Sequence, residues 1–159
     1  MKQLASYLND HLAGSVAALE LLEHLINAHE NKPLAKFFKD LRDDIGTDQE
    51  VLRKLLRKFK AKESAVRKAG GWIAEKFSRV KIQGAGEKVG ELGLVQALEA
   101  LVLGITGKQL LWRALSASLG SSPLLKGVDL GGLEERAIEQ IERVEAKRIE
   151  AAREAFLRE

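Results

Sequence analysis

Apolar residues recur at helical spacing along most of the chain and divide it into four long segments. The first segment extends from about residue 2 to 29, and the second from about 33 to 62. The third covers about 88–119, and the fourth about 129–157. Helices of about 30 residues are about 45 Å long, at about 1.5 Å per residue. The pattern therefore predicts an all-α protein in which four helices of similar length form a bundle.

Residues that favour helix ends stand between these segments. Asn31 is expected to cap the second helix, and Pro33 suits its opening turn because proline lacks an N–H. Gly120 and Pro123 are expected to end the third helix, and Asp129 to cap the fourth. These residues support the predicted boundaries.

Each helix except the third has one apolar stripe that we expect to face the core. The expected inward positions of the first helix are Leu4, Leu8, Leu12, Ser15, Leu19, Leu22 and Ile26, and those of the second are Phe37, Leu41, Leu52, Leu55 and Phe59. Those of the fourth are Leu133, Ala137, Ile138, Ile141, Val144, Ile149, Ala152 and Phe156. Two ionisable residues, Glu145 and Arg148, fall inside the fourth stripe, so the sequence places charge in the core.

The third segment is apolar around most of its circumference. A run of small residues predicts close approach of another helix: Gly93, Ala97, Ala100, Gly104, Gly107 and Ala114. An outward stripe, Leu92, Leu103 and Leu110, is expected to be covered by residues 61–90 or by a second subunit, and we favour a homodimer. The segment is not expected to span a membrane, because Gln96, Glu99, Lys108, Gln109 and Arg113 interrupt it.

Residues 61–90 are too many for an ordinary connection between bundle helices, which is about 2–8 residues long. We expect this segment to cross from one end of the bundle to the other and to contain a short helix around residues 72–80. The whole chain, 1–159, is then a single domain. A bundle with one long crossover between the second and third helices resembles the ferritin-like superfamily. The stretches LASYLNDHLAGSVAALELLEHL (4–25) and LRDDIGTDQEVLRKLL (41–56) resemble its first two helices.

This resemblance implies a place for a di-iron centre, but the chain lacks the ligands. Such centres take a Glu from each of two helices and a Glu-x-x-His motif from each of the other two. The three histidines, His11, His24 and His29, all belong to the first segment. A complete di-iron site is therefore excluded, and we expect neither a metal nor another cofactor.

The resemblance places Glu145 and Arg148 at the Glu-x-x-His position of the fourth helix. We expect the guanidinium of Arg148 to supply the positive charge of the missing metal, paired with Glu145 and with Asp44 or Asp48 of the second helix. This buried ionic cluster has three interpretations. It is an internal salt bridge, which we favour, a pocket for a small anion or substrate, or an atypical metal site made by Asp44, Asp48 and Glu145.

Residues 51–90 are strongly basic, with twelve Lys and Arg against three Glu, among Trp72 and two phenylalanines. Nucleic acid, an anionic membrane surface and an acidic protein are candidate partners for such a region. We favour the simpler interpretation, in which the aromatic residues pack on the bundle and the basic side chains are solvated.

The rest of the composition narrows the function further. The chain has no cysteine and no signal-peptide pattern at its start, which predicts a cytoplasmic protein. It has no nucleophile elbow, phosphate loop or HExxH motif. We therefore expect a non-catalytic structural or protein-interaction module, with a metal-binding or small-ligand-binding bundle as the alternative and nucleic-acid binding as a weaker one.

Overall fold

The computed structural model describes residues 2–62 and 90–157 of the chain, and the long elements in these residues are α-helices. They are α1 (Lys2–Ala28), α2 (Pro33–Lys58), α4 (Glu91–Leu119) and α5 (Leu130–Leu157). A 3₁₀ helix, η1 (Pro123–Leu125), lies in the turn between α4 and α5. The prediction of an all-α four-helix bundle is confirmed. The expected short helix around 72–80 lies outside the described residues.

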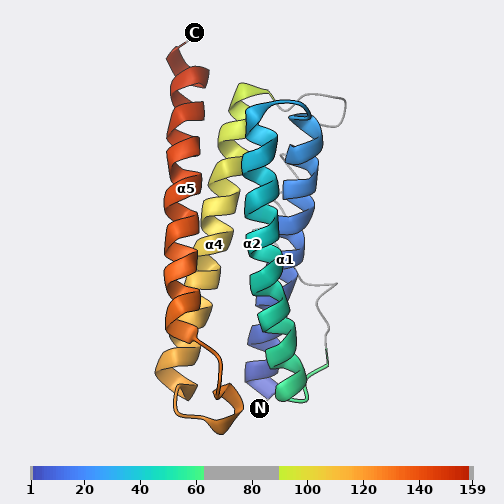
Figure 1. Ribbon diagram of the computed structural model, residues 1–159, viewed down its shortest axis with the longest axis vertical. Helices are drawn as coiled ribbons and strands as arrows, with labels where there is room; N and C mark the ends of the chain where they lie inside the picture. Colours follow the sequence, from blue (N-terminus) through green and yellow to red (C-terminus); the bar gives the residue numbers. More distant parts are fainter. Residues whose placement is uncertain (1, 63–89, 158–159) are drawn as a thin grey trace.

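The four helices form two antiparallel hairpins, α1–α2 and α4–α5, which pack side by side (Figure 1). α1 and α5 run in one direction along the bundle, and α2 and α4 run in the opposite direction (Figure 1). α1 also packs against α4. α2 thus ends at one end of the bundle, and α4 begins at the other.

Two of the expected helix caps can be compared with the structure. The Asp129 carboxylate accepts a hydrogen bond from the Gly132 N–H at 2.9 Å, so Asp129 caps α5 as predicted. A Cβ on Gly132 would overlap this carboxylate, which explains the glycine. The prediction for Asn31 was wrong. Asn31 has a left-handed backbone with φ 63° in the turn after α1, and Lys32 occupies the N-cap of α2 without a side-chain cap.

The inward face of α5 agrees only in part with the predicted one, of which Leu133, Ala137 and Val144 are buried. Its buried residues are Leu130, Leu133, Ala137, Gln140, Val144 and Ala151. Ile138, Ile149 and Phe156, which we expected in the core, are exposed. After Leu133 the buried positions of α5 carry small side chains or an amide, so its isoleucines and Phe156 were a misleading guide to its orientation.

The core consists of two apolar clusters, one towards each end of the bundle. The first includes Leu22, Phe38 and Leu101, and the second includes Leu12, Leu55 and Trp112. Polar residues lie between them along three helices, namely Ser15 on α1, Asp48 on α2 and Lys108 on α4, and Gln140 of α5 reaches this level from among residues of the first cluster. With Gln49 and Arg136, which contact them, we call these residues the polar layer.

Among the described helices, α4 is long and apolar enough by composition to cross a membrane. This is weak evidence for a span, because the core helix of a bundle has the same composition. One face of α4, including Leu98, Leu101 and Trp112, is buried inside the protein.

Candidate functional site

Asp48 is the centre of the polar layer. Its side chain is 1% exposed, and one of its oxygens, Oδ2, accepts hydrogen bonds from Lys108 Nζ at 2.5 Å and from Gln140 Nε2 at 3.1 Å. Arg136 Nη2 lies 3.1 Å from the other oxygen, Oδ1, as an ion-pair contact that lacks hydrogen-bond geometry. One carboxylate from α2 thus contacts side chains of α4 and α5 through the core.

Lys108 is the buried cation of this layer, with a side chain that is 14% exposed. Besides Asp48, its ammonium group donates to Gln140 Oε1 at 2.5 Å. Burial lowers the pKa of Lys108 below its ordinary value, and the Asp48 carboxylate opposes that change. An ammonium group has three N–H donors, so these two hydrogen bonds leave one donor available.

A pocket of about 310 Å³ lies beside the polar layer, between α1, α2 and α4. Most of its wall is apolar, with Ala18, Ile45, Leu52, Ile105 and Leu111 among the lining residues. Its polar wall includes Lys108, Asp48 and the hydrogen-bonded pair Gln49 and Ser15, whose Nε2 and Oγ are 2.9 Å apart. A concave, mostly apolar site with few polar groups is typical of small-molecule binding sites.

Glycines shape this pocket on both of its long sides. Gly14 of α1 and Gly104 of α4 line it, and a Cβ on either would meet no atom within 4 Å. A Cβ on Gly107 would come no closer than 4.0 Å to the His11 ring. We expected the small residues of α4 to allow close helix packing, and Ala97 and Ala100 are indeed buried. Gly104 and Gly107 instead leave space that a ligand can fill.

His11 lies on the pocket wall next to Tyr7, and their ring centroids are 4.6 Å apart in an edge-to-face arrangement. Burial lowers the pKa of the His11 imidazole, although the nearby Asp10 carboxylate raises it. His11 is therefore neutral near pH 7. Trp112 also lines the pocket, and its buried indole N–H has no hydrogen-bond partner among residues 2–62 and 90–157.

The predicted ionic cluster of Asp44, Asp48, Glu145 and Arg148 is not formed as a unit. Arg148 donates two hydrogen bonds of 2.6 Å to Glu145, three residues earlier on α5, and these side chains are 26% and 40% exposed. These bonds hold the pKa of Glu145 below its ordinary value. Asp44 forms a separate ion pair with Arg143 at 2.6 Å. Only Asp48 lies in the core, because the inward position of α5 at this level is Gln140.

The sequence also left open an atypical metal site made by Asp44, Asp48 and Glu145. Within residues 2–62 and 90–157, no three His, Asp or Glu side chains come together as a metal-binding group. Asp44, Asp48 and Glu145 contact basic partners of their own, so the site proposed for them is not assembled. His29 instead donates a hydrogen bond from Nδ1 to the Leu25 carbonyl oxygen at 2.8 Å.

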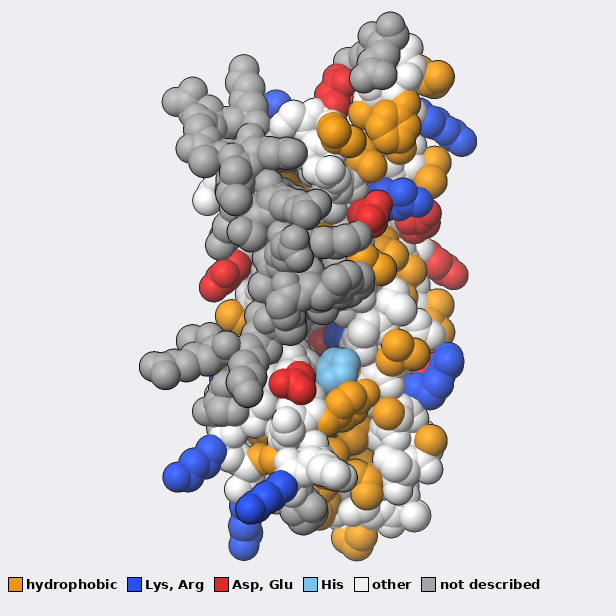
Figure 2. Space-filling view, turned by 180° about the vertical axis from the view of Figure 1, so that it is seen from behind, with side chains coloured by type: hydrophobic (Ala, Val, Ile, Leu, Met, Phe, Trp, Pro, Cys, Tyr) orange, Lys and Arg blue, Asp and Glu red, His pale blue; other side chains and the backbone are white. Residues whose placement is uncertain are grey.

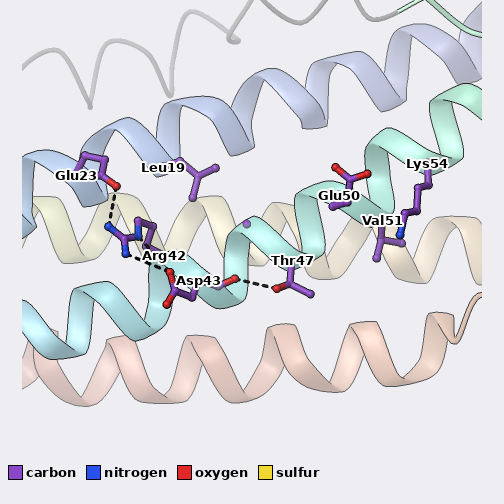
Figure 3. Close-up of a pocket in the computed structure, with 9 residues that line it drawn as sticks. Leu19, Glu23, Arg42, Asp43, Thr47, Glu50, Val51 and Lys54 are labelled. Carbon is purple, nitrogen blue, oxygen red and sulfur yellow. Dashed lines mark hydrogen bonds and ion pairs between the residues drawn. The ribbon is translucent and has the colours of Figure 1, made fainter.

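A second, shallower groove lies on the surface between α1 and α2 (Figure 3). Its charged residues are largely paired with protein groups. Arg42 contacts Glu23 at 3.0 Å and Asp43 at 3.2 Å, as the dashed lines in Figure 3 show, and Glu50 pairs with Arg57 at 2.9 Å. The pocket beside the polar layer is the better candidate site because its polar groups are buried.

Sequence reasoning missed Lys108 and Gln140 as members of the site. Lys108 stands in the middle of the most apolar segment, and a basic residue at that position was the available signal. Comparison of the chain with protein-family models, with curated proteins and with solved structures finds no match. The geometry of the site is therefore the basis for any functional conclusion.

Proposed function

We propose that this protein binds a small amphipathic molecule in the pocket between α1, α2 and α4, and that it does not transform that molecule. The observation that carries the proposal is the pocket itself, about 310 Å³ of mainly apolar wall with a buried Lys108–Asp48 pair at one side. Of the alternatives that the sequence leaves open, a small-ligand-binding bundle fits this geometry best.

The pocket's hydroxyl supports a binding role over a catalytic one. Ser15 Oγ donates to the main-chain oxygen of Leu12 at 2.7 Å and accepts from Gln49. A nucleophilic serine needs a general base within hydrogen-bond reach, and here the hydroxyl proton is committed to a carbonyl group. The ammonium group of Lys108 is similarly held by two acceptors.

The fold is proposed to be ferritin-like. Two features support this: α2 and α4 run in the same direction, and the polar layer lies between two apolar clusters, deep inside the bundle (Figure 1). In ferritin-like proteins the bundle interior holds the metal ligands. In this interpretation the Lys108 ammonium, rather than the predicted Arg148 guanidinium, stands as the internal cation.

The proposal can be tested by filling the pocket. Gly104→Leu places a side chain in the open space beside Gly104, and replacing a helical glycine also favours the helix. Binding of 1-octanol, followed by isothermal titration calorimetry, is expected to be saturable in the natural protein and lost in this variant. The matched control is Gly46→Leu, on the α1–α2 groove, where a Cβ also has open space. Equal octanol binding by all three proteins contradicts the proposal.

A second candidate function is self-association, which we expected from the outward leucines of α4. Leu92 and Leu110 are 52% and 51% exposed, and Ile138, Ile149 and Phe156 of α5 are also exposed. Figure 2 shows hydrophobic side chains along the side of the molecule where α4 and α5 lie. Sedimentation of the natural protein and of Leu110→Glu tests for a homodimer. If the natural protein is a dimer and Leu110→Glu is a monomer, self-association through this surface is supported. If both proteins are monomers, the proposal of a homodimer fails.

Binding of nucleic acid remains a weaker proposal, because most of the basic segment lies outside the described residues. Arg53, Arg57 and Lys58 of α2 belong to its described part. Binding to a DNA duplex that weakens steeply with salt would support it. Retention on heparin without any DNA binding would contradict this proposal.

A further inference from the structure

The polar side of the pocket offers more hydrogen-bond donors and positive charge than it uses. Lys108 donates to Asp48 and Gln140, and no residue in the described part of the chain accepts from its third N–H. Gln49 gives one amide N–H to Ser15 and retains another. A ligand that completes this set must present acceptors.

The charges of the polar layer also favour a ligand that carries acceptor groups. Two cations, Lys108 and Arg136, contact the single carboxylate of Asp48. His11 of α1 also lines the pocket, with its pKa lowered by burial, and Asp10 is an exposed acid among the lining residues. The carboxylate of Asp48 is thus shared between two positive groups and does not fully neutralise Lys108, on which Asp44 acts more weakly. Buried charges are stable when they are paired and hydrogen-bonded.

The size of the pocket limits the rest of the ligand. Its volume of about 310 Å³ equals that of about ten water molecules, at about 30 Å³ each. The apolar wall from Ala18, Ile45 and Ile105 suits a hydrocarbon chain or ring. A molecule of about ten non-hydrogen atoms is the appropriate scale.

We propose that the ligand is a small monocarboxylic acid, whose carboxylate accepts a hydrogen bond from Lys108 and whose apolar body lies along α1 and α4. The inference rests on the proposed function and specifies the chemical class of its ligand. Octanoate has the appropriate size and charge and serves as the probe. 1-Octanol and octylamine have the same chain with a neutral or a cationic end.

The experiment uses the fluorescence of Trp112, which lines the pocket. The chain has two tryptophans, so Trp72→Phe leaves Trp112 as the single reporter. In this background at pH 7, octanoate is expected to bind at least tenfold more tightly than 1-octanol, and octylamine more weakly than either. Lys108→Met should abolish the preference for octanoate over 1-octanol. Asp48→Asn should increase the affinity for octanoate, because Lys108 then lacks its protein counter-ion.

Opposite effects of the Lys108 and Asp48 substitutions distinguish a ligand contact from a purely structural pair, for which both variants would weaken binding. Circular dichroism establishes that each variant is folded, and if Lys108→Met is not, the ligand series and Asp48→Asn decide the question. Equal affinities for octanoate and octanol overturn the carboxylate inference but leave the proposed function standing. If none of the three probes binds, both proposals fail.

Discussion

Of all substitutions in the polar layer, we expect replacement of Asp48 to reduce the free energy of unfolding most. Its carboxylate is almost fully buried and contacts Lys108, Gln140 and Arg136. Asp48→Ala leaves the Lys108 ammonium in the core without its counter-ion, and breaking a buried pair in this way costs about 3–5 kcal/mol. We expect a loss of this size in the free energy of unfolding, measured with guanidinium chloride.

The matched control is Asp44→Ala, one helical turn earlier on α2. The Asp44–Arg143 pair is exposed, with side chains that are 40% and 46% accessible, so its removal should cost less than about 1 kcal/mol. Similar losses from the two substitutions would contradict the central role of Asp48.

His11 should make the stability depend on pH in the weakly acidic range. Burial lowers its pKa in the folded state below the ordinary value of 6.5, so the unfolded chain binds the proton more readily. Stability rises with pH wherever the unfolded state binds more protons, and the contribution is therefore lost as pH falls through 6.5. We expect Tm to fall between pH 7.5 and pH 5.5 and His11→Gln to reduce this fall. An unchanged pH profile in the variant would show that other groups cause it.

The sequence led to the correct principle for the core but to the wrong cation. An internal acid was expected to be neutralised by a basic side chain, and Asp48 is paired in this way. Arg148 was selected because it lies within an apolar stripe of α5, where alternate large residues suggested the inward face. Lys108 was counted only as an interruption of an apolar helix. Which of two basic residues reaches the acid depends on helix rotation, which periodicity alone does not determine to within one residue.

At the scale of the helices, the start of α5 depends on a single capping side chain. Asp129 accepts the Gly132 N–H, which otherwise lacks a partner within the helix. Asp129→Ala should lower the free energy of unfolding by about 1 kcal/mol, measured by urea denaturation. Asp129→Ser keeps a capping oxygen and is expected to retain most of the stability. If Asp129→Ser lowers the free energy of unfolding as much as Asp129→Ala, the capping hydrogen bond is not what makes Asp129 stabilising.

Helix boundaries were more predictable than helix faces. The predicted ends of the fourth helix agree closely with Leu130–Leu157, because Asp129 is a local signal that acts within one turn. The orientation of α5 was predicted only in part, since the structure places Gln140 inward and leaves Ile138 exposed. That choice depends on α4, whose small residues accept a close neighbour. Contacts between helices are a tertiary property and leave only an ambiguous trace in one sequence.

At the scale of the whole molecule, the polar layer separates two apolar clusters and links three helices by hydrogen bonds. Apolar side chains alone would tolerate sliding of one helix along another by about a turn. The contacts of Asp48 with Lys108 and Gln140 are satisfied at only one register. The layer therefore favours a unique arrangement of the α1–α2 and α4–α5 hairpins, at some cost in desolvation.

This role predicts that stability and specificity can be separated. Replacing the layer together, by Asp48→Leu, Lys108→Met and Gln140→Leu, removes the buried charges without leaving one unpaired. Such replacements are often neutral or stabilising by about 1–4 kcal/mol, whereas Asp48→Leu alone should be strongly destabilising. Guanidinium unfolding measures the stability, and amide hydrogen exchange with the dispersion of NMR signals measures whether one arrangement persists. We expect the triple variant to be at least as stable as the natural protein but to show broadened signals and faster exchange.

A triple variant that is well ordered as well as stable would mean that the apolar clusters define the register by themselves, and that the polar layer is maintained for the ligand.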